Sequence, residues 1–123
     1  MKTRAQQIMS DKDARTSQEV TQCIHDIAAE FEPYIIRQRR HFHKHPEPSL
    51  AEVRTTSDIA NQLDAMNIPY ERPLKTGLVA TLRGTAPDAY REDGTPRRRI
   101  LLRADIDALP VTEQTGEEFA SVI

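Results

Sequence analysis

Two aspartates, Asp105 and Asp107, stand two positions apart where a short apolar run comes to an end. The run is Ile100–Leu102, and arginines flank it on both sides, which is typical of an interior strand. Pro110 follows soon afterwards and would stop regular strand pairing. Because ligands bind at the carboxyl ends of strands in open α/β sheets, this pair is the leading candidate for a functional site.

Two carboxylates in this position have three possible uses. They can bind a hard cation such as Mg²⁺ through oxygen atoms, as in phosphoryl or glycosyl transferases. One of them can instead orient a metal-bound histidine or a general acid or base. The plainer alternative is that one carboxylate caps the next turn while the other is solvated. Spacing leaves all three open, although the sequence has no Gly-rich phosphate loop of the kind that a transferase would need.

The histidines His41, His43 and His45 form a second group of potential metal ligands. Neutral imidazole is a good ligand for transition metals. On a helix, however, residues two apart point to different faces, and Pro46 directs His45 away from helical geometry. We therefore expect these histidines to make structural hydrogen bonds near the sheet edge and not to form a metal site.

The first element that must position these residues is a long helix. Thr16 and Glu19 have the capping-box pattern, and apolar residues then recur at helical spacing, which predicts a helix from about Ser17. Pro33 either kinks this helix or begins the next one. The helical path should continue to the histidines and end at the prolines that follow them.

A second helix is predicted over residues 50–66. Ser49 and Glu52 form another capping box before it, and Asn67 is a plausible left-handed stop after it. Helix capping and exposure to solvent also explain Glu47 better than a role as an acidic group in a functional cleft.

Strands are predicted at residues 70–72, 78–83 and 100–102, with a turn at residues 75–77 and a second at Asp93 and Gly94. Together these elements predict an α/β fold, in which two helices are followed by the first strands of a mixed central sheet.

Composition limits the class of protein. The chain has 123 residues, of which 37% are hydrophobic and 29% charged, so it should be one polar, soluble domain or less. Its 17 basic and 19 acidic residues give a net charge of -2, and we expect neither nucleic acid nor a membrane as a partner. Cys23 is the single cysteine, and no signal peptide or membrane-length apolar run occurs, which makes the cytoplasm the expected location.

One block of residues resembles a known protein family. Residues 103–110 have the sequence Arg-Ala-Asp-Ile-Asp-Ala-Leu-Pro, and Glu113, residues 115–116 and residues 119–121 complete the pattern RADIDALP…E-x-TG-x-x-FAS. This pattern is similar to a block of the aminoacylase, hippurate-hydrolase and auxin-amino-acid hydrolase branch of the dinuclear metallopeptidases.

Two further blocks resemble the same branch. Residues 39–47 fit its RR-x-x-H-x-HPE signature and are followed by the matching Glu52 and Thr55, while residues 75–80 fit its K-TG-hydrophobic-A turn. The three blocks occur in the order and spacing of the branch from residue 35 to residue 121. Their combination is specific, although any single block would be a weak signal.

The resemblance implies that residues 17–123 are the incomplete N-terminal part of a zinc-peptidase-like catalytic domain. Residues 1–16 are polar and lack periodicity, which predicts a flexible tail before that domain. The resemblance also implies a metal-dependent amidohydrolase that cleaves N-acyl amino acids or related amides and uses two divalent ions of zinc, manganese, cobalt or nickel. A lid domain, which this sequence lacks, would permit a homodimer.

The resemblance also assigns roles to the aspartates. In the wider family a His-x-Asp unit occupies this strand end, but here Arg103-Ala104-Asp105 stands there, so the metal-binding histidine is absent. Asp105 is the candidate for an orienting residue, and Asp107 is a weaker one. The branch takes its metal ligands mainly from a later Met-His-Ala-Cys-Gly-His-Asp segment, a Glu-Glu pair and distal histidines, none of which this sequence contains.

We therefore expect the 123-residue chain to bind no metal and to be inactive by itself. The alternative is a truncated, non-catalytic remnant or a fragment that binds a partner.

Overall fold

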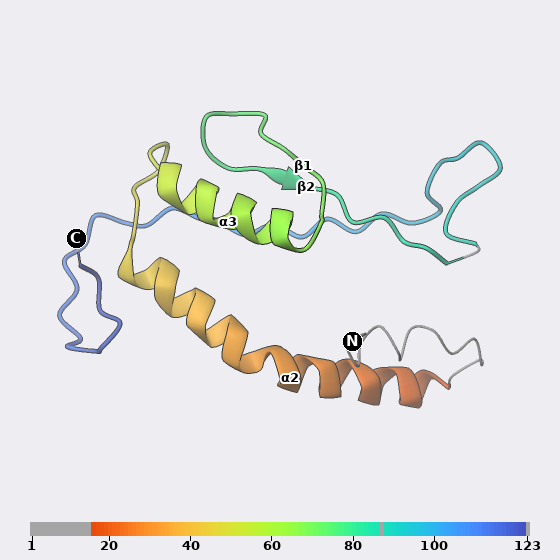
Figure 1. Ribbon diagram of the computed structural model, residues 1–123, viewed down its shortest axis with the longest axis horizontal. Coiled ribbons are helices and arrows are strands. Elements are labelled where there is room, and N and C mark those ends of the chain that lie inside the picture. The colour runs from red at the N-terminus through yellow and green to blue at the C-terminus, as the bar shows by residue number, and fades with distance from the viewer. Residues whose placement is uncertain (1–15, 87, 123) are drawn as a thin grey trace. The chain divides into compact units, whose positions relative to one another are not determined.

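The computed structural model describes residues 16–86 and 88–122 of the chain (Figure 1). These residues fall into two units, one that ends at His41 and one that begins at Phe42. The polar tail expected at residues 1–16 lies outside the described residues, apart from Thr16. None of the helices in the described ranges is long and apolar enough to cross a bilayer.

Helix α2 runs from Ser17 to Lys44 and begins as the sequence predicts. The backbone N–H of Thr16 donates to Oε2 of Glu19 at 2.7 Å, and the N–H of Glu19 donates back to Oγ1 of Thr16 at 3.3 Å. This reciprocal pair is the predicted capping box, and it satisfies N–H groups that have no partner inside the helix. Pro33 lies within α2, which continues past it, so no second helix begins there.

Helix α3 runs from Val53 to Ala65, three residues shorter at its start than predicted. Leu50 has a φ of 66°, a left-handed conformation that cannot form the first turn of a right-handed helix. The predicted capping box of Ser49 and Glu52 is wrong, because Glu52 occupies the N-cap position without a side-chain capping bond. At the other end Asn67, with a φ of 56°, is the predicted left-handed stop.

The buried residues of the described chain are few and mostly polar. They lie at the start of α3 and along one of its faces: Glu52, Thr55, Thr56 and Ala60. Oγ1 of Thr56 accepts a hydrogen bond from the N–H of Gly77 at 2.8 Å, which fastens the predicted turn at residues 75–77 to the helix. Gly77 has a φ of 78°, a conformation that favours glycine.

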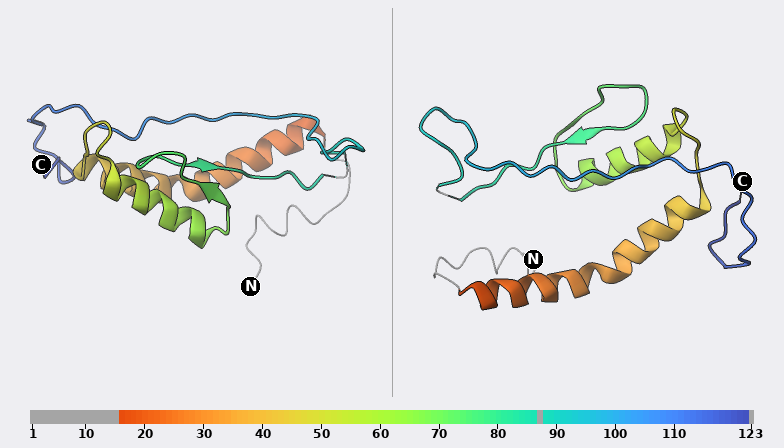
Figure 2. Two further views of the ribbon diagram at one scale, coloured as in Figure 1. Left: turned by 90° about the horizontal axis from the view of Figure 1, so that it is seen from above. Right: turned by 180° about the vertical axis from the view of Figure 1, so that it is seen from behind.

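Strands β1, Tyr70–Glu71, and β2, Val79–Ala80, pair antiparallel, with Tyr70 opposite Ala80. They confirm the first two predicted strands in shortened form. Figure 2 shows this hairpin alongside α3, and the hydroxyl of Tyr70 donates to Oδ2 of Asp64 on that helix at 3.3 Å. The predicted turn at Asp93 and Gly94 is also present.

The third predicted strand is not formed in the described chain. Residues 98–107 follow an extended path (Figure 2) but are assigned to no strand. Ile100, Leu101 and Leu102 are 88%, 88% and 90% exposed, so the prediction that this run is buried is wrong for this chain. A strand exists only through hydrogen bonds to a neighbouring strand, and within the described residues the sheet consists of β1 and β2 alone.

Candidate functional site

The segment that carries Asp105 and Asp107 is anchored where the second unit begins. The N–H of Ala108 donates to the backbone carbonyl of Glu47 at 2.9 Å, and the N–H of Val122 donates to the carbonyl of Lys44 at 3.1 Å. The two ends of residues 108–122 are thus fastened to carbonyls three positions apart, which closes these residues into a compact loop. We call this stretch the 108–122 loop.

The side chain of Glu47 joins the same anchor to helix α3. Its Oε1 accepts from the N–H of Arg54 at 3.0 Å and its Oε2 from the N–H of Thr55 at 2.7 Å. Burial raises the pKa of Glu47, but the hydrogen bonds from Thr55 and Arg54 outweigh burial and hold the pKa below its ordinary value. The carboxylate therefore caps the helix from outside and complements the positive end of its dipole.

Glu113 holds the 108–122 loop closed from within. Its carboxylate accepts hydrogen bonds from the Thr115 hydroxyl, from the N–H of Ser121 at 2.6 Å and from Nε2 of His43 at 2.9 Å. These three bonds lower the pKa of Glu113 to about 2, and the bond from Thr115 has the largest effect, followed by those from Ser121 and His43. The ring of Phe119 meets the His43 ring edge to face, with centroids 5.6 Å apart.

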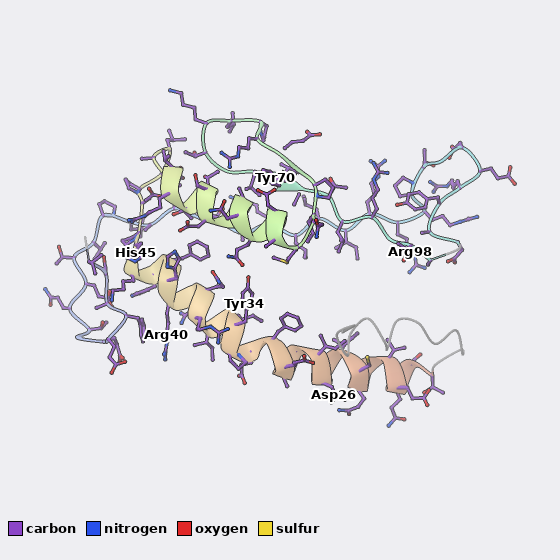
Figure 3. The ribbon with its side chains drawn as sticks, viewed as in Figure 1. Asp26, Tyr34, Arg40, His45, Tyr70 and Arg98 are labelled. Atoms are coloured by element: carbon purple, nitrogen blue, oxygen red, sulfur yellow. The ribbon has the colours of Figure 1, made fainter. Side chains whose placement is uncertain are left out.

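His43 therefore makes a structural hydrogen bond of the kind that the sequence predicts, with a partner in the 108–122 loop. Figure 3 shows His45 directly after the end of α2. Within the described ranges no group of three or more histidine, cysteine, aspartate or glutamate side chains is placed to hold a metal ion. The residues that the structure describes therefore do not form a two-metal centre by themselves.

Asp105 and Asp107 both lie on the surface of the segment. Oδ1 of Asp105 pairs with Nη2 of Arg103 at 2.7 Å, and their side chains are 68% and 81% exposed. This pairing is local, two positions along one extended stretch, and its exposure makes it a weak interaction. The structure thus places both predicted site residues next to an anchored loop, and among the described residues neither belongs to a group of acidic or imidazole side chains that could hold a metal ion.

Glu52 is the buried carboxylate of the second unit, with 7% of its surface exposed. Its own backbone N–H and the hydroxyl of Thr76 lower its pKa, although burial opposes them. Its Oε2 atom is buried and accepts no hydrogen bond from the described residues. The carboxylate remains charged in a polar cluster that also contains Thr56 and supports the turn at residues 75–77.

The anchoring roles of Glu113 and of the Glu47 main chain do not follow from the sequence. Pairing across 70 positions has no local pattern that would have revealed it.

Comparison with known proteins gives a consistent result. No protein-family model matches the chain. It is 42% identical over 90 residues to an uncharacterised hydrolase of Staphylococcus saprophyticus, a match that covers 73% of this chain and 21% of that protein. An uncharacterised hydrolase of Staphylococcus epidermidis is 42% identical over 88 residues, which is 72% of this chain and 20% of that protein. The chain thus spans about one fifth of the length of the curated relatives it matches.

A solved structure shares the fold. The YxeP protein of Bacillus subtilis, described as a dinuclear metal-binding peptidase of the M20 family, superposes with a TM-score of 0.64 at 39% sequence identity. The match covers 77% of this chain and 25% of YxeP. The chain is thus similar in both sequence and fold to an N-terminal fragment of an M20 peptidase-like α/β domain.

Proposed function

We propose that this chain is the N-terminal part of a metal-dependent amidohydrolase that cleaves N-acyl amino acids or related amides. The observation that carries the proposal is the combined sequence and fold match to a dinuclear metal-binding peptidase. The amide substrate is inferred from the three blocks between residues 35 and 121 that resemble the aminoacylase branch.

In this proposal the described residues provide scaffold and positioning. Asp105 is the residue that would orient a metal-bound histidine supplied from elsewhere in the complete protein, and Asp107 has a weaker claim to that role. Two divalent ions of zinc, manganese, cobalt or nickel would be held by groups outside this sequence, because the groups within the described ranges do not form a suitable cluster.

The proposal extends to the setting of the complete enzyme. It would act in the cytoplasm on a small-molecule substrate, with no nucleic acid or membrane partner, and could form a homodimer through a lid domain. The 123-residue chain alone would neither hydrolyse N-acetyl or N-benzoyl amino acids nor bind two metal ions. Stoichiometric binding of two Zn²⁺, Mn²⁺ or Co²⁺ ions per chain, measured by titration calorimetry, would overturn this division of roles.

A chimera tests the function directly. Residues 35–122 of this chain would replace the matching quarter of YxeP, and hydrolysis of a panel of N-acyl amino acids would be measured with each metal ion. We expect the chimera to cleave at least one N-acetyl or N-benzoyl amino acid. A folded, metal-loaded chimera that leaves the whole panel intact, while intact YxeP cleaves it, would contradict the proposal.

The alternative of a non-catalytic, partner-binding fragment has one observation in its favour, the exposed extended run at residues 98–107. That run can bind a partner without any catalytic role for the chain, so the two functions need separate tests.

A further inference from the structure

Helix α2 carries an apolar stripe along one face. Its members, spaced alternately four and three positions apart, are Val20, Ile24, Ile27, Phe31 and Tyr34, and we call them the α2 stripe. This spacing places side chains on one side of a helix, and it is the spacing found where two helices pair in a coiled coil. The rings of Phe31 and Tyr34 meet edge to face with centroids 6.5 Å apart, as expected of neighbours on one face.

The α2 stripe is largely open to solvent. Val20, Ile24 and Phe31 are 44%, 62% and 48% exposed, and no residue of α2 is buried. Pro33 follows Phe31 by two positions, about 200° around the helix, so its ring lies on the opposite side and does not interrupt the stripe. A continuous apolar face of this kind is a surface that a second helix can cover.

The charges of α2 are divided between its two halves. Residues 17–32 contain four acidic residues and no lysine or arginine, whereas residues 33–44 contain four basic residues and no acidic one. The acidic residues are Glu19, Asp26, Glu30 and Glu32, and the basic residues are Arg37, Arg39, Arg40 and Lys44. This division also complements the helix dipole. Two parallel copies of α2 would place like charges side by side, but two antiparallel copies would place each acidic half beside a basic half.

We propose that α2 pairs with the α2 helix of a second copy of this chain, in antiparallel orientation, through the α2 stripe. A two-fold axis across the middle of the helix lets the same stripe serve both copies. Glu19 and Arg37 support this orientation, because they are 18 positions apart, about five full turns, and so lie on the same side of the stripe. In an antiparallel pair that side of one helix faces the same side of the other, so Glu19 of each copy lies toward the basic half of its partner.

This interface differs from a homodimer formed through a lid domain, and it makes no use of the proposed hydrolase activity. It involves residues 17–44 alone. The pairing therefore does not depend on how the two units of the chain are arranged.

Sedimentation equilibrium of the 123-residue chain tests the pairing. We expect a monomer–dimer equilibrium with a dissociation constant below about 100 µM. The dissociation constant should rise by at least about threefold when NaCl is raised from about 50 mM to about 300 mM, because salt screens the opposite charges that face each other. A dissociation constant that falls with added salt would contradict the antiparallel arrangement.

A monomer at every concentration up to about 1 mM would overturn the proposal. Slow amide exchange along the α2 stripe in such a monomer would show that another segment of the same chain covers the stripe.

Matched variants identify the surface. Ile24→Gln places a polar side chain in the α2 stripe of both copies and should weaken the dimer by at least about 30-fold. Ile36→Gln is the control, because Ile36 is the same residue type in the same helix, 42% exposed and about 120° around the helix from Ile24. It should change the dissociation constant by less than about threefold. Glutamine has a higher helix propensity than isoleucine, so both variants should keep α2, which circular dichroism checks. Equal effects of the two variants would contradict pairing through the stripe.

Cys23, the single cysteine of the chain, reports the orientation. In an antiparallel pair centred on α2 the two copies of Cys23 would be about 20 Å apart along the helix axis, whereas a parallel pair in register would bring them within range of a disulfide. Mild oxidation should therefore give no covalent dimer, and nitroxide labels at Cys23 should lie roughly 20 to 30 Å apart by pulsed electron paramagnetic resonance. Rapid formation of a disulfide between two copies of Cys23 would overturn the antiparallel arrangement.

Discussion

Nε2 of His43 lies 2.9 Å from Oε2 of Glu113, and this contact joins residues 70 positions apart in the chain. The same carboxylate oxygen accepts from the N–H of Ser121. The Glu113 side chain thus joins the last turn of α2 to the far end of the 108–122 loop. The loop that follows Asp105 and Asp107 is therefore closed from within by one ionised side chain, in addition to its two main-chain anchors.

Acid should open this loop. The pKa of Glu113 is lowered to about 2 from an ordinary value of 4.5, so its contribution to stability is fully present above about pH 4.5 and is lost as the pH falls toward 2. Amide exchange of Ser121, corrected for intrinsic rates, should stay slow at pH 6 and accelerate across that window. Glu113→Gln should remove the pH dependence, while Glu117→Gln, in the same loop, should preserve it. An unchanged profile in Glu113→Gln would show that another group closes the loop.

Removal of the Glu47 carboxylate should loosen the start of α3. Glu47→Ala deprives the N–H groups of Arg54 and Thr55 of their acceptor, and loss of such a cap costs about 1 kcal/mol. Exchange of these two amides, followed by NMR, should therefore accelerate by about fivefold. Ser49→Ala is the control, because Ser49 is the capping residue that the sequence predicts and the structure does not use. A larger effect from Ser49→Ala would favour the original capping box.

The turn at residues 75–77 should depend on the Thr56 hydroxyl. Thr56→Val keeps the shape of the side chain but leaves the Gly77 N–H without its acceptor, at a cost of about 1 to 3 kcal/mol. Exchange at Gly77 should accelerate by about fivefold or more, and Thr56→Ser should restore slow exchange. Thr112→Val, at an exposed position, serves as the control for the loss of a hydroxyl. If the Gly77 amide still exchanges slowly in Thr56→Val, a group other than the Thr56 hydroxyl anchors the turn.

The chain by itself should unfold with little cooperativity. Apolar burial is the main favourable term in folding, and Ala60 is the one fully buried hydrophobic residue of the described chain. Differential scanning calorimetry of the isolated chain should show a broad transition with a small enthalpy. A sharp two-state transition of a monomer would contradict this expectation and would point to apolar packing that the described residues do not have.

Asp105 and Asp107 should differ in importance in the chimera with YxeP. If Asp105 orients a metal-bound histidine, Asp105→Asn should lower activity or metal affinity by about 10- to 100-fold, the usual effect of such a residue. Asp107→Asn should have a smaller effect. Metal content by mass spectrometry, measured beside kcat, separates loss of orientation from misfolding. Equal losses in both variants, or a larger loss in Asp107→Asn, would reverse the assignment.

The elements that the sequence predicted well are those whose cause is local. The capping box of Thr16 and Glu19 and the left-handed Asn67 depend on residues within one turn, and both are present. The start of α3 was misplaced because its cap comes from Glu47, beyond a turn at Leu50 that a four-residue pattern does not reveal. The error arose because the capping residue lies seven positions before the first amide that it caps, and not because the helix propensity of these residues is weak.

The candidate site was predictable only in part for a related reason. The positions of Asp105 and Asp107 after an apolar run follow from the sequence, but the ligand environment of a carboxylate depends on groups from distant segments. The Ile100–Leu102 run shows the same dependence, because its residue types favour a strand while its pairing needs neighbours that the described chain lacks.

The two anchors of the 108–122 loop, at Ala108 and Val122, consist of main-chain atoms. Every residue type except proline supplies the same N–H donor, so substitutions at these positions leave the anchors intact. Evolution can therefore change loop side chains other than Glu113 without releasing the main-chain anchors beside the segment that carries Asp105. The loop can therefore vary in sequence among related proteins while the main-chain scaffold that holds it stays constant.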